Sequence, residues 1–153
     1  MDVRFSKIKM LEGYRSLLPL VQTSTGTAMR DKKTCCYYLG NPLVEVRVSG
    51  FYNDEESRKH EQYHFDVWVN SFIAFELVAK ALLFRDKTCI GNYLNILGQW
   101  YMLCALLENS RFDMVAHQND PEGREYARWY YDTQRDVQAQ KELLDLEGKG
   151  CLC

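Results

Sequence analysis

The sequence predicts a helix-dominated α+β fold, with about four helices packed with one β-hairpin at residues 35–49. Two long segments, 65–84 and 90–107, are apolar nearly all round, which is typical of central helices. Between Val44 and Val48, valines alternate with charged residues, which indicates a strand with one face on the core. The chain has 153 residues, of which 46% are hydrophobic, enough for a real core.

We expect a single domain over residues 1–148, followed by a frayed tail at 149–153. The net charge of −2 argues against a general nucleic-acid binder. Residues 1–10 alternate charged and apolar side chains, unlike a signal peptide. The apolar stretch 65–84 contains Asp, Glu and Lys and is too polar for an ordinary membrane span. A cytoplasmic location is therefore expected.

A helix, a loop and the hairpin are expected in the N-terminal third of the chain. Residues 2–18 place apolar side chains on one broad face, which predicts a first helix. Pro19 should end it, because proline disfavours the helical conformation in the residue before it. The polar, aperiodic segment 22–33 predicts a loop. The hairpin follows, with strands at 35–39 and 43–48 joined by a Gly-Asn-Pro turn.

Three further helices are expected after the hairpin. The first spans about 53–84, because an Asn-Asp-Glu-Glu sequence supplies a capping side chain and acidic residues for its first turn. The second spans about 90–107 and should pack antiparallel to it. The third begins at Asp120, an N-cap residue followed by proline, and ends before Gly148.

One pentapeptide spells H-E-x-x-H, with His60 and His64 as its histidines and Glu61 between them. Histidines four apart lie on the same side of a helix and can share one Zn²⁺, and the glutamate can act as general base. The motif and its place after a hairpin resemble the zincin metallopeptidases. The resemblance implies a zinc-dependent hydrolase, with His117 or Glu108 as the third ligand.

Three positions around this motif depart from the zincin pattern. Arg58 stands where the family has an uncharged residue, and Asp66 stands where it has an apolar one. Asn70 occupies the position of the third histidine in the extended pattern. The resemblance therefore covers five residues and a rough layout.

A second pattern, R-x5-H, is formed by Arg111 and His117. In sequence it is similar to the active-site motif of HEPN ribonucleases, in which arginine and histidine converge on the scissile phosphate. This resemblance implies a metal-independent ribonuclease. Phe112 departs from the family pattern, because a polar residue usually follows the arginine.

The last helix carries four consecutive large side chains: Arg128, Trp129, Tyr130 and Tyr131. At 100° per residue these cannot all face the core, so at least one ring should be exposed or lie at a contact. Trp, Tyr and Arg are the residue types enriched at binding hot spots. The segment is therefore a candidate surface for another protein or for a second copy of the chain.

The chain has six cysteines, and free thiols are the default expectation without a secretory signal. Cys35 and Cys36 form one close pair, and Cys151 and Cys153 form another. Neither pair has the C-x2-C spacing of structural zinc sites.

Taken together, these patterns favour a small cytoplasmic protein that acts by protein–protein binding, of inhibitor, immunity or accessory type. The chain has no glycine-rich phosphate loop, and its ten tyrosines suit a binding surface. No cofactor is expected in this interpretation, and neither a membrane nor a nucleic acid is an expected partner. The alternatives are a zinc-dependent hydrolase that uses residues 60–64 and, third, a HEPN-like ribonuclease.

Overall fold

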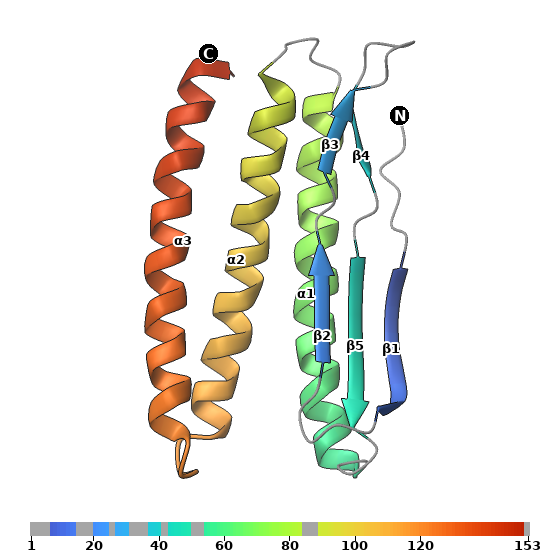
Figure 1. Cartoon of the computed structure of the whole chain (residues 1–153), viewed down its shortest axis with the longest axis vertical. Coiled ribbons are helices and arrows are strands. Elements are labelled where there is room, and N and C mark those ends of the chain that lie inside the picture. The colour runs from blue at the N-terminus through green and yellow to red at the C-terminus, as the bar shows by residue number, and fades with distance from the viewer. Residues whose placement is uncertain are drawn as a thin grey trace.

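The computed structural model of the chain describes residues 54–83 and 89–151 and, in the N-terminal third, the backbone of the strands (Figure 1). Side chains are described for residues 54–82 and 89–151. The elements are β1 (Lys7–Tyr14), β2 (Leu20–Ser24), β3 (Thr27–Arg30), β4 (Tyr37–Gly40), β5 (Leu43–Ser49), α1 (Glu55–Leu83), α2 (Ile90–Ala116) and α3 (Gly123–Cys151).

The three helices stand side by side, with α2 between α1 and α3 (Figure 1). Each helix runs antiparallel to the one before it, so the start of α1, the end of α2 and the start of α3 lie at the same end of the molecule (Figure 1). Within the described residues, no helix has the length and apolar character needed to cross a membrane.

The predicted α+β fold, with four helices and one hairpin, is wrong. Where side chains are described, the chain forms three helices and no strand. The helix predicted over 2–18 does not form, because the backbone of Lys7–Tyr14 is a strand. The charged and apolar residues from Lys7 to Met10 alternate with the period of a strand. The apolar residues of segment 2–18 also fit the period of a helix, and this longer pattern led to the helix prediction.

The hairpin predicted at 35–49 is also wrong, because β4 and β5 do not pair with each other. β5 is the middle strand of a three-stranded sheet, parallel to β1 and antiparallel to β2, and β4 pairs with β3. The loop predicted at 22–33 contains the end of β2 and all of β3. Cys35 and Cys36 lie outside the described residues.

The start of α1 follows from the capping side chain predicted there. The Asp54 carboxylate accepts hydrogen bonds from the Ser57 backbone N–H at 2.8 Å and from the Ser57 hydroxyl at 3.0 Å. These bonds satisfy a backbone donor that has no partner within the helix. The predicted helix over 53–84 is confirmed by α1, which ends at Leu83.

The second helix begins at Ile90 as predicted but continues to Ala116, well past the predicted end at Leu107. A tight turn leads into α3. A Cβ atom on Gly123 would lie 2.8 Å from the His117 carbonyl oxygen and 3.0 Å from that of Gln118, so the turn requires glycine.

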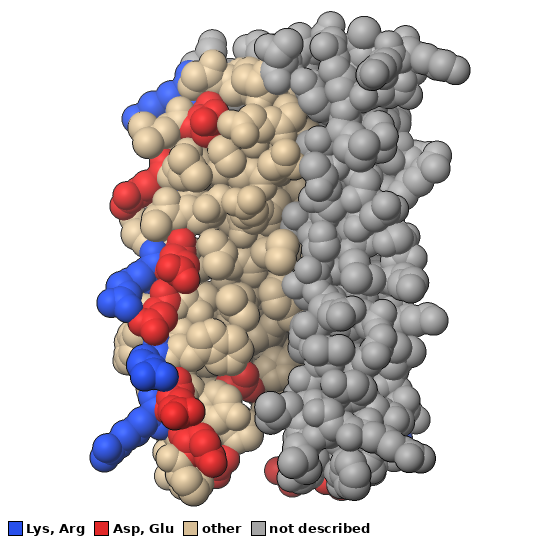
Figure 2. Space-filling view, in the orientation of Figure 1, with Lys and Arg blue, Asp and Glu red and all other residues tan. Residues whose placement is uncertain are grey.

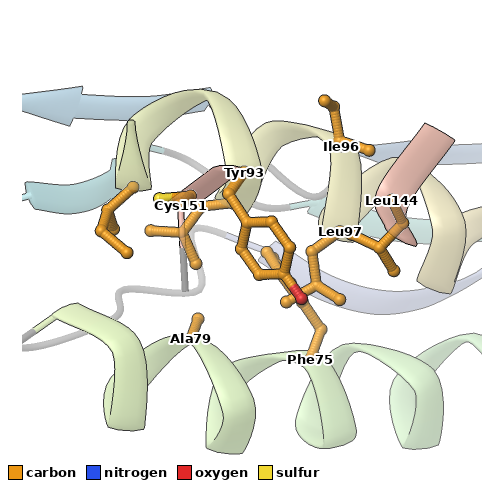
Figure 3. Packing of buried hydrophobic residues seen from close by; sticks show 9 residues of the cluster. Phe75, Ala79, Tyr93, Ile96, Leu97, Leu144 and Cys151 are labelled. Atoms are coloured by element: carbon orange, nitrogen blue, oxygen red, sulfur yellow. The ribbon is translucent and has the colours of Figure 1, made fainter. Parts of the chain in front are cut away.

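The main core cluster joins all three helices (Figure 3). Phe75 and Ala79 of α1 face α2, whose Ile90 and Leu94 are fully buried. On the other side of α2, Leu144 of α3 closes the cluster with 6% of its surface exposed. Burying a side chain of this size contributes about 1.5–3 kcal/mol, so this cluster is a large part of what holds the helices together.

A disulfide joins Cys89, at the start of α2, to Cys151, at the end of α3. The expectation of free thiols is therefore wrong for these two cysteines. The bridge closes a loop with a sequence separation of 62 residues, which in the chain-entropy account stabilises the fold by roughly 4 kcal/mol. α3 thus stays helical into the tail predicted to fray at 149–153. Leu152 and Cys153 lie outside the described residues.

Replacing Leu94 by alanine tests the central place of α2. Leu94 is 0% exposed, so Leu94→Ala should lower the free energy of unfolding by about 2–5 kcal/mol in urea denaturation. Leu146 is 66% exposed. The matched Leu146→Ala variant should therefore change the free energy of unfolding by less than about 0.5 kcal/mol. An equal loss of unfolding free energy in the two variants would contradict the central position of Leu94 in the core.

Candidate metal centre

Polar side chains gather where the start of α1 meets the end of α2. His60 and His64 lie one turn apart on α1, so they point to the same side of the helix. Asp113 faces them from α2. Because α1 and α2 are antiparallel, the early residues of one helix lie beside the late residues of the other.

The three donor atoms converge closely. The Asp113 Oδ1 atom lies 3.2 Å from His60 Nε2 and 3.0 Å from His64 Nε2. The two Nε2 atoms are 3.0 Å apart. Nitrogen and oxygen ligands on one tetrahedral Zn²⁺ stand about 3.3 Å from one another, given bonds of about 2.0 Å. The triangle is therefore close to the size that a single metal ion requires.

A second hydrogen bond fixes the ring of His64. Its Nδ1 atom lies 2.9 Å from Asn109 Oδ1. An amide oxygen only accepts hydrogen bonds, so Nδ1 carries a proton, and in the neutral ring Nε2 would be the nitrogen with the free lone pair. Metal-binding histidines are oriented in this way by an acceptor on the ring nitrogen that does not bind the metal.

His64 and Asp113 perturb each other's pKa. Burial alone would raise the pKa of Asp113, but hydrogen bonds from His60 and His64 lower it to about 2. Burial disfavours the charged form of His64, yet the hydrogen bond and charge of Asp113 outweigh this and raise its pKa. In the metal-free protein, the two side chains therefore stabilise each other as an ion pair.

Glu61 completes the group as a buried acid. Only 7% of its surface is exposed, and its Oε2 atom has no hydrogen-bond partner among the described residues. Burial raises the pKa of this carboxyl, against the attraction of His64 and His60. A buried carboxylate oxygen without a hydrogen-bond partner is costly, which sets Glu61 apart from the other carboxylates of this group.

An aromatic wall covers one side of the centre. The Phe112 ring stacks on Tyr63 at a centroid distance of 4.0 Å and lies 5.0 Å from the His60 ring. The Tyr63 hydroxyl donates to Glu108 at 2.6 Å, and Glu108 forms an ion pair with Arg111. The hydrogen bond from Arg111 lowers the pKa of Glu108.

Of the two third ligands that the sequence suggested, Glu108 is held by Arg111 and Tyr63 rather than by the histidines. His117 lies closer to the centre. It offers one ligand atom that lies within 4.8 Å of those of His60 and Asp113. The predicted Arg111–His117 pair is not joined by a described contact, because His117 hydrogen-bonds to Asp120 instead.

Asp113 was not among the predicted site residues, although the sequence contains a signal for it. Asn109, Asp113 and His117 repeat at every fourth position, so they share one helical face. That face was hidden because the helix was predicted to end at Leu107, which left these residues in a segment without assigned structure.

The aromatic segment on α3 follows closely after Tyr126, whose ring stacks on His117, and it is largely exposed. Trp129 is 43% exposed and Tyr131 is 58% exposed, and Arg128 is also exposed. Tyr130 is half-buried, and its ring meets that of Tyr131 edge-on at 5.2 Å. The four side chains therefore spread around the helix rather than forming one contact with the core.

Two imidazoles and a carboxylate, beside a buried carboxyl without a partner, fit a divalent transition metal. This donor set suits Zn²⁺ and also Fe²⁺. No protein-family description, curated protein or solved structure matches this chain. The geometry of the centre is therefore the basis for assigning it a function.

The ion pair predicts a pH dependence of stability in chelator-treated protein. The stabilisation from the lowered pKa of Asp113 is present above about pH 4 and is lost as the pH falls towards 2. The stabilisation from the raised pKa of His64 is present below about pH 6.5. It is lost as the pH rises through the pKa that His64 has in the folded protein. Asp113→Asn should therefore cost most near pH 5.5, about 2 kcal/mol, in urea denaturation.

The matched control is Asp132→Asn, which removes an exposed carboxylate paired with Arg135. It should change the free energy of unfolding by less than about 1 kcal/mol at every pH. A cost of Asp113→Asn that is the same at pH 3, 5.5 and 8 would show that packing, and not the ion pair, is what the substitution disturbs.

Proposed function

We propose that this protein is a zinc-dependent hydrolase with His60, His64 and Asp113 as metal ligands. The observation that carries the proposal is the convergence of three donor atoms within 3.0–3.2 Å of one another. Three protein ligands are typical of catalytic zinc, which keeps a further position for water or substrate. The resemblance of residues 60–64 to the zincin motif supports the same chemistry.

Glu61 is the general base in this proposal. A bound metal would supply Lewis acidity and lower the pKa of a water molecule to near neutrality. With a metal bound, the Glu61 carboxylate would accept a proton from the attacking water and would return it to the leaving group. Burial raises the pKa of Glu61, which makes its carboxylate a better proton acceptor than an exposed one.

Access to the centre lies on the side of the α2–α3 turn. The side chains of His60 and His117 are 23% and 31% exposed, whereas that of His64 is 9% exposed. The Phe112 and Tyr63 rings keep water away from the side of the centre that they cover. A peptide or other amide substrate would approach past His60 and His117.

Metal content and turnover together test this function. Protein purified without chelator should hold about one zinc per chain by elemental analysis, and His60→Ala/His64→Ala should hold none. Glu61→Gln should keep the zinc and lose hydrolysis by 100-fold or more, because only the base is removed. Glu56→Gln, an exposed position on the same helix, is the matched control and should leave both properties unchanged.

Two results would sink the proposal. One is the absence of zinc in the wild-type protein even after zinc is added. The other is hydrolysis that survives Glu61→Gln and chelation. Chelator-insensitive cleavage of RNA would instead favour the HEPN-like alternative, in which Arg111 and His117 act without a metal.

A second candidate function is protein–protein binding through α3, favoured by the exposure of Trp129 and Tyr131. Large aromatic side chains gain much area on burial and lose little conformational freedom, which makes them good anchors at interfaces. Figure 2 shows Lys, Arg, Asp and Glu along the edge formed by α3. Intrahelical ion pairs such as Lys141–Asp145 account for part of this charge. The partner is another protein or a second copy of the chain.

Self-association is the form of this binding that can be tested without a known partner. Sedimentation of the wild-type chain should show a dimer that Trp129→Ala/Tyr131→Ala shifts to monomer by tenfold or more in Kd. Gln134→Ala, exposed on the same helix, should not. A wild-type chain that stays monomeric at high concentration would exclude the homodimer.

A cytoplasmic location remains a prediction. The Cys89–Cys151 disulfide weighs against it, because such bonds persist mainly in oxidising compartments.

A further inference from the structure

We propose that His117 is a fourth ligand of the metal centre, carried on the α2–α3 turn and displaced when substrate binds. This inference rests on the metal site proposed above and adds a ligand from a third part of the chain. The site would then be closed by four protein ligands at rest and opened by the loss of one.

The position of His117 is the first argument. One of its ring nitrogens lies within 4.8 Å of ligand atoms of both His60 and Asp113. Its ring meets the His60 ring edge-on at a centroid distance of 5.4 Å. Ligands of tetrahedral zinc stand about 3.3 Å from one another, so the separation of at most 4.8 Å exceeds that of shared ligands by no more than about 1.5 Å.

The orientation of the ring is the second argument. His117 Nδ1 lies 2.7 Å from the Asp120 carboxylate Oδ2. In the neutral imidazole, Nδ1–H donates to that carboxylate and Nε2 keeps its lone pair. A carboxylate behind a histidine is the arrangement that orients metal-binding histidines in proteins. Asn109 plays the same part behind His64.

The turn explains how His117 can bind and leave. Its backbone N–H closes α2 by donating to the Asp113 carbonyl at 2.9 Å, and its φ and ψ of −104° and 16° depart from helical values. The Asp120 N–H donates back to the His117 carbonyl at 3.0 Å. The ring stacks on Tyr126 of α3 at 4.6 Å. His117 is thus held beside the centre by contacts with α2, the turn and α3, and it follows the last residue of α2.

In this proposal the α2–α3 turn controls access to the metal. Four protein ligands close a zinc site, and three leave it open. Departure of His117 would free the position that faces solvent, on the side where substrate enters. Asp120 and Tyr126 would then set how readily the site opens.

Cobalt titration tests the fourth ligand without relying on activity. Co²⁺ is added to the full-length metal-free chain, its visible absorption is recorded, and Zn²⁺ affinity is measured by competition with a coloured chelator. His117→Ala should lower Zn²⁺ affinity at least tenfold and change the Co²⁺ spectrum. Asp120→Ala, which keeps the ring but removes its acceptor, should weaken affinity by roughly 10–100-fold. Glu122→Ala, exposed on the same turn, is the matched control and should alter neither.

The outcomes separate this inference from the proposed function. If the wild type and both the His117→Ala and Asp120→Ala variants give the same spectrum and affinity, while His60→Ala/His64→Ala loses the metal, His117 is not a ligand and the three-ligand site stands. If the wild type binds neither Co²⁺ nor Zn²⁺, both proposals fail. Should His117→Ala not fold, Asp120→Ala decides, because wild-type affinity in that variant overturns the fourth ligand.

Discussion

The placing of α1 against α2 at one end of the molecule depends on the contact of one buried carboxylate, Asp113, with two histidines on α1. Burying an unpaired carboxylate costs several kcal/mol, so Asp113 needs both imidazoles as partners. The three donor atoms within 3.2 Å of one another fix the rotation of α1 against α2, because one helical position of slippage would separate them. The same contact brings together the ligands of the proposed metal centre, so the stability of this end and the proposed chemistry would have one origin.

The opposite end of the molecule is held by different means. There the Cys89–Cys151 disulfide and the packing of Leu144 against α2 join α3 to α2. Apolar packing tolerates small adjustments, whereas the spacing of metal ligands does not. For the proposed hydrolase, covalent and apolar contacts would keep α2 in place while its end presents Asp113 and the C-cap residue His117.

The sequence predicts the part of the site that lies on one element and misses the part that depends on helix length. Spacing alone places His60 and His64 on one face, because helical geometry is local. Asp113 was missed because Asn109 to His117 mixes polar and apolar residues without a clear stripe, and only packing against α1 extends that helix. The N-terminal error has a similar cause: the pattern from Lys7 to Met10 fits two periods, and strand pairing with β5 decides between them.

Charge balance gives the strongest reason to place a divalent ion in this centre. Without a metal, two imidazole nitrogens stand 3.0 Å apart, so a proton must lie between or beside them. Asp113 and Glu61 then bring two buried carboxylates to the same place, and a single protonated histidine leaves one negative charge uncompensated. A divalent cation neutralises both carboxylates while the histidines remain neutral ligands. Burial raises the pKa of Glu61, and protonation is the other means by which this carboxyl becomes neutral.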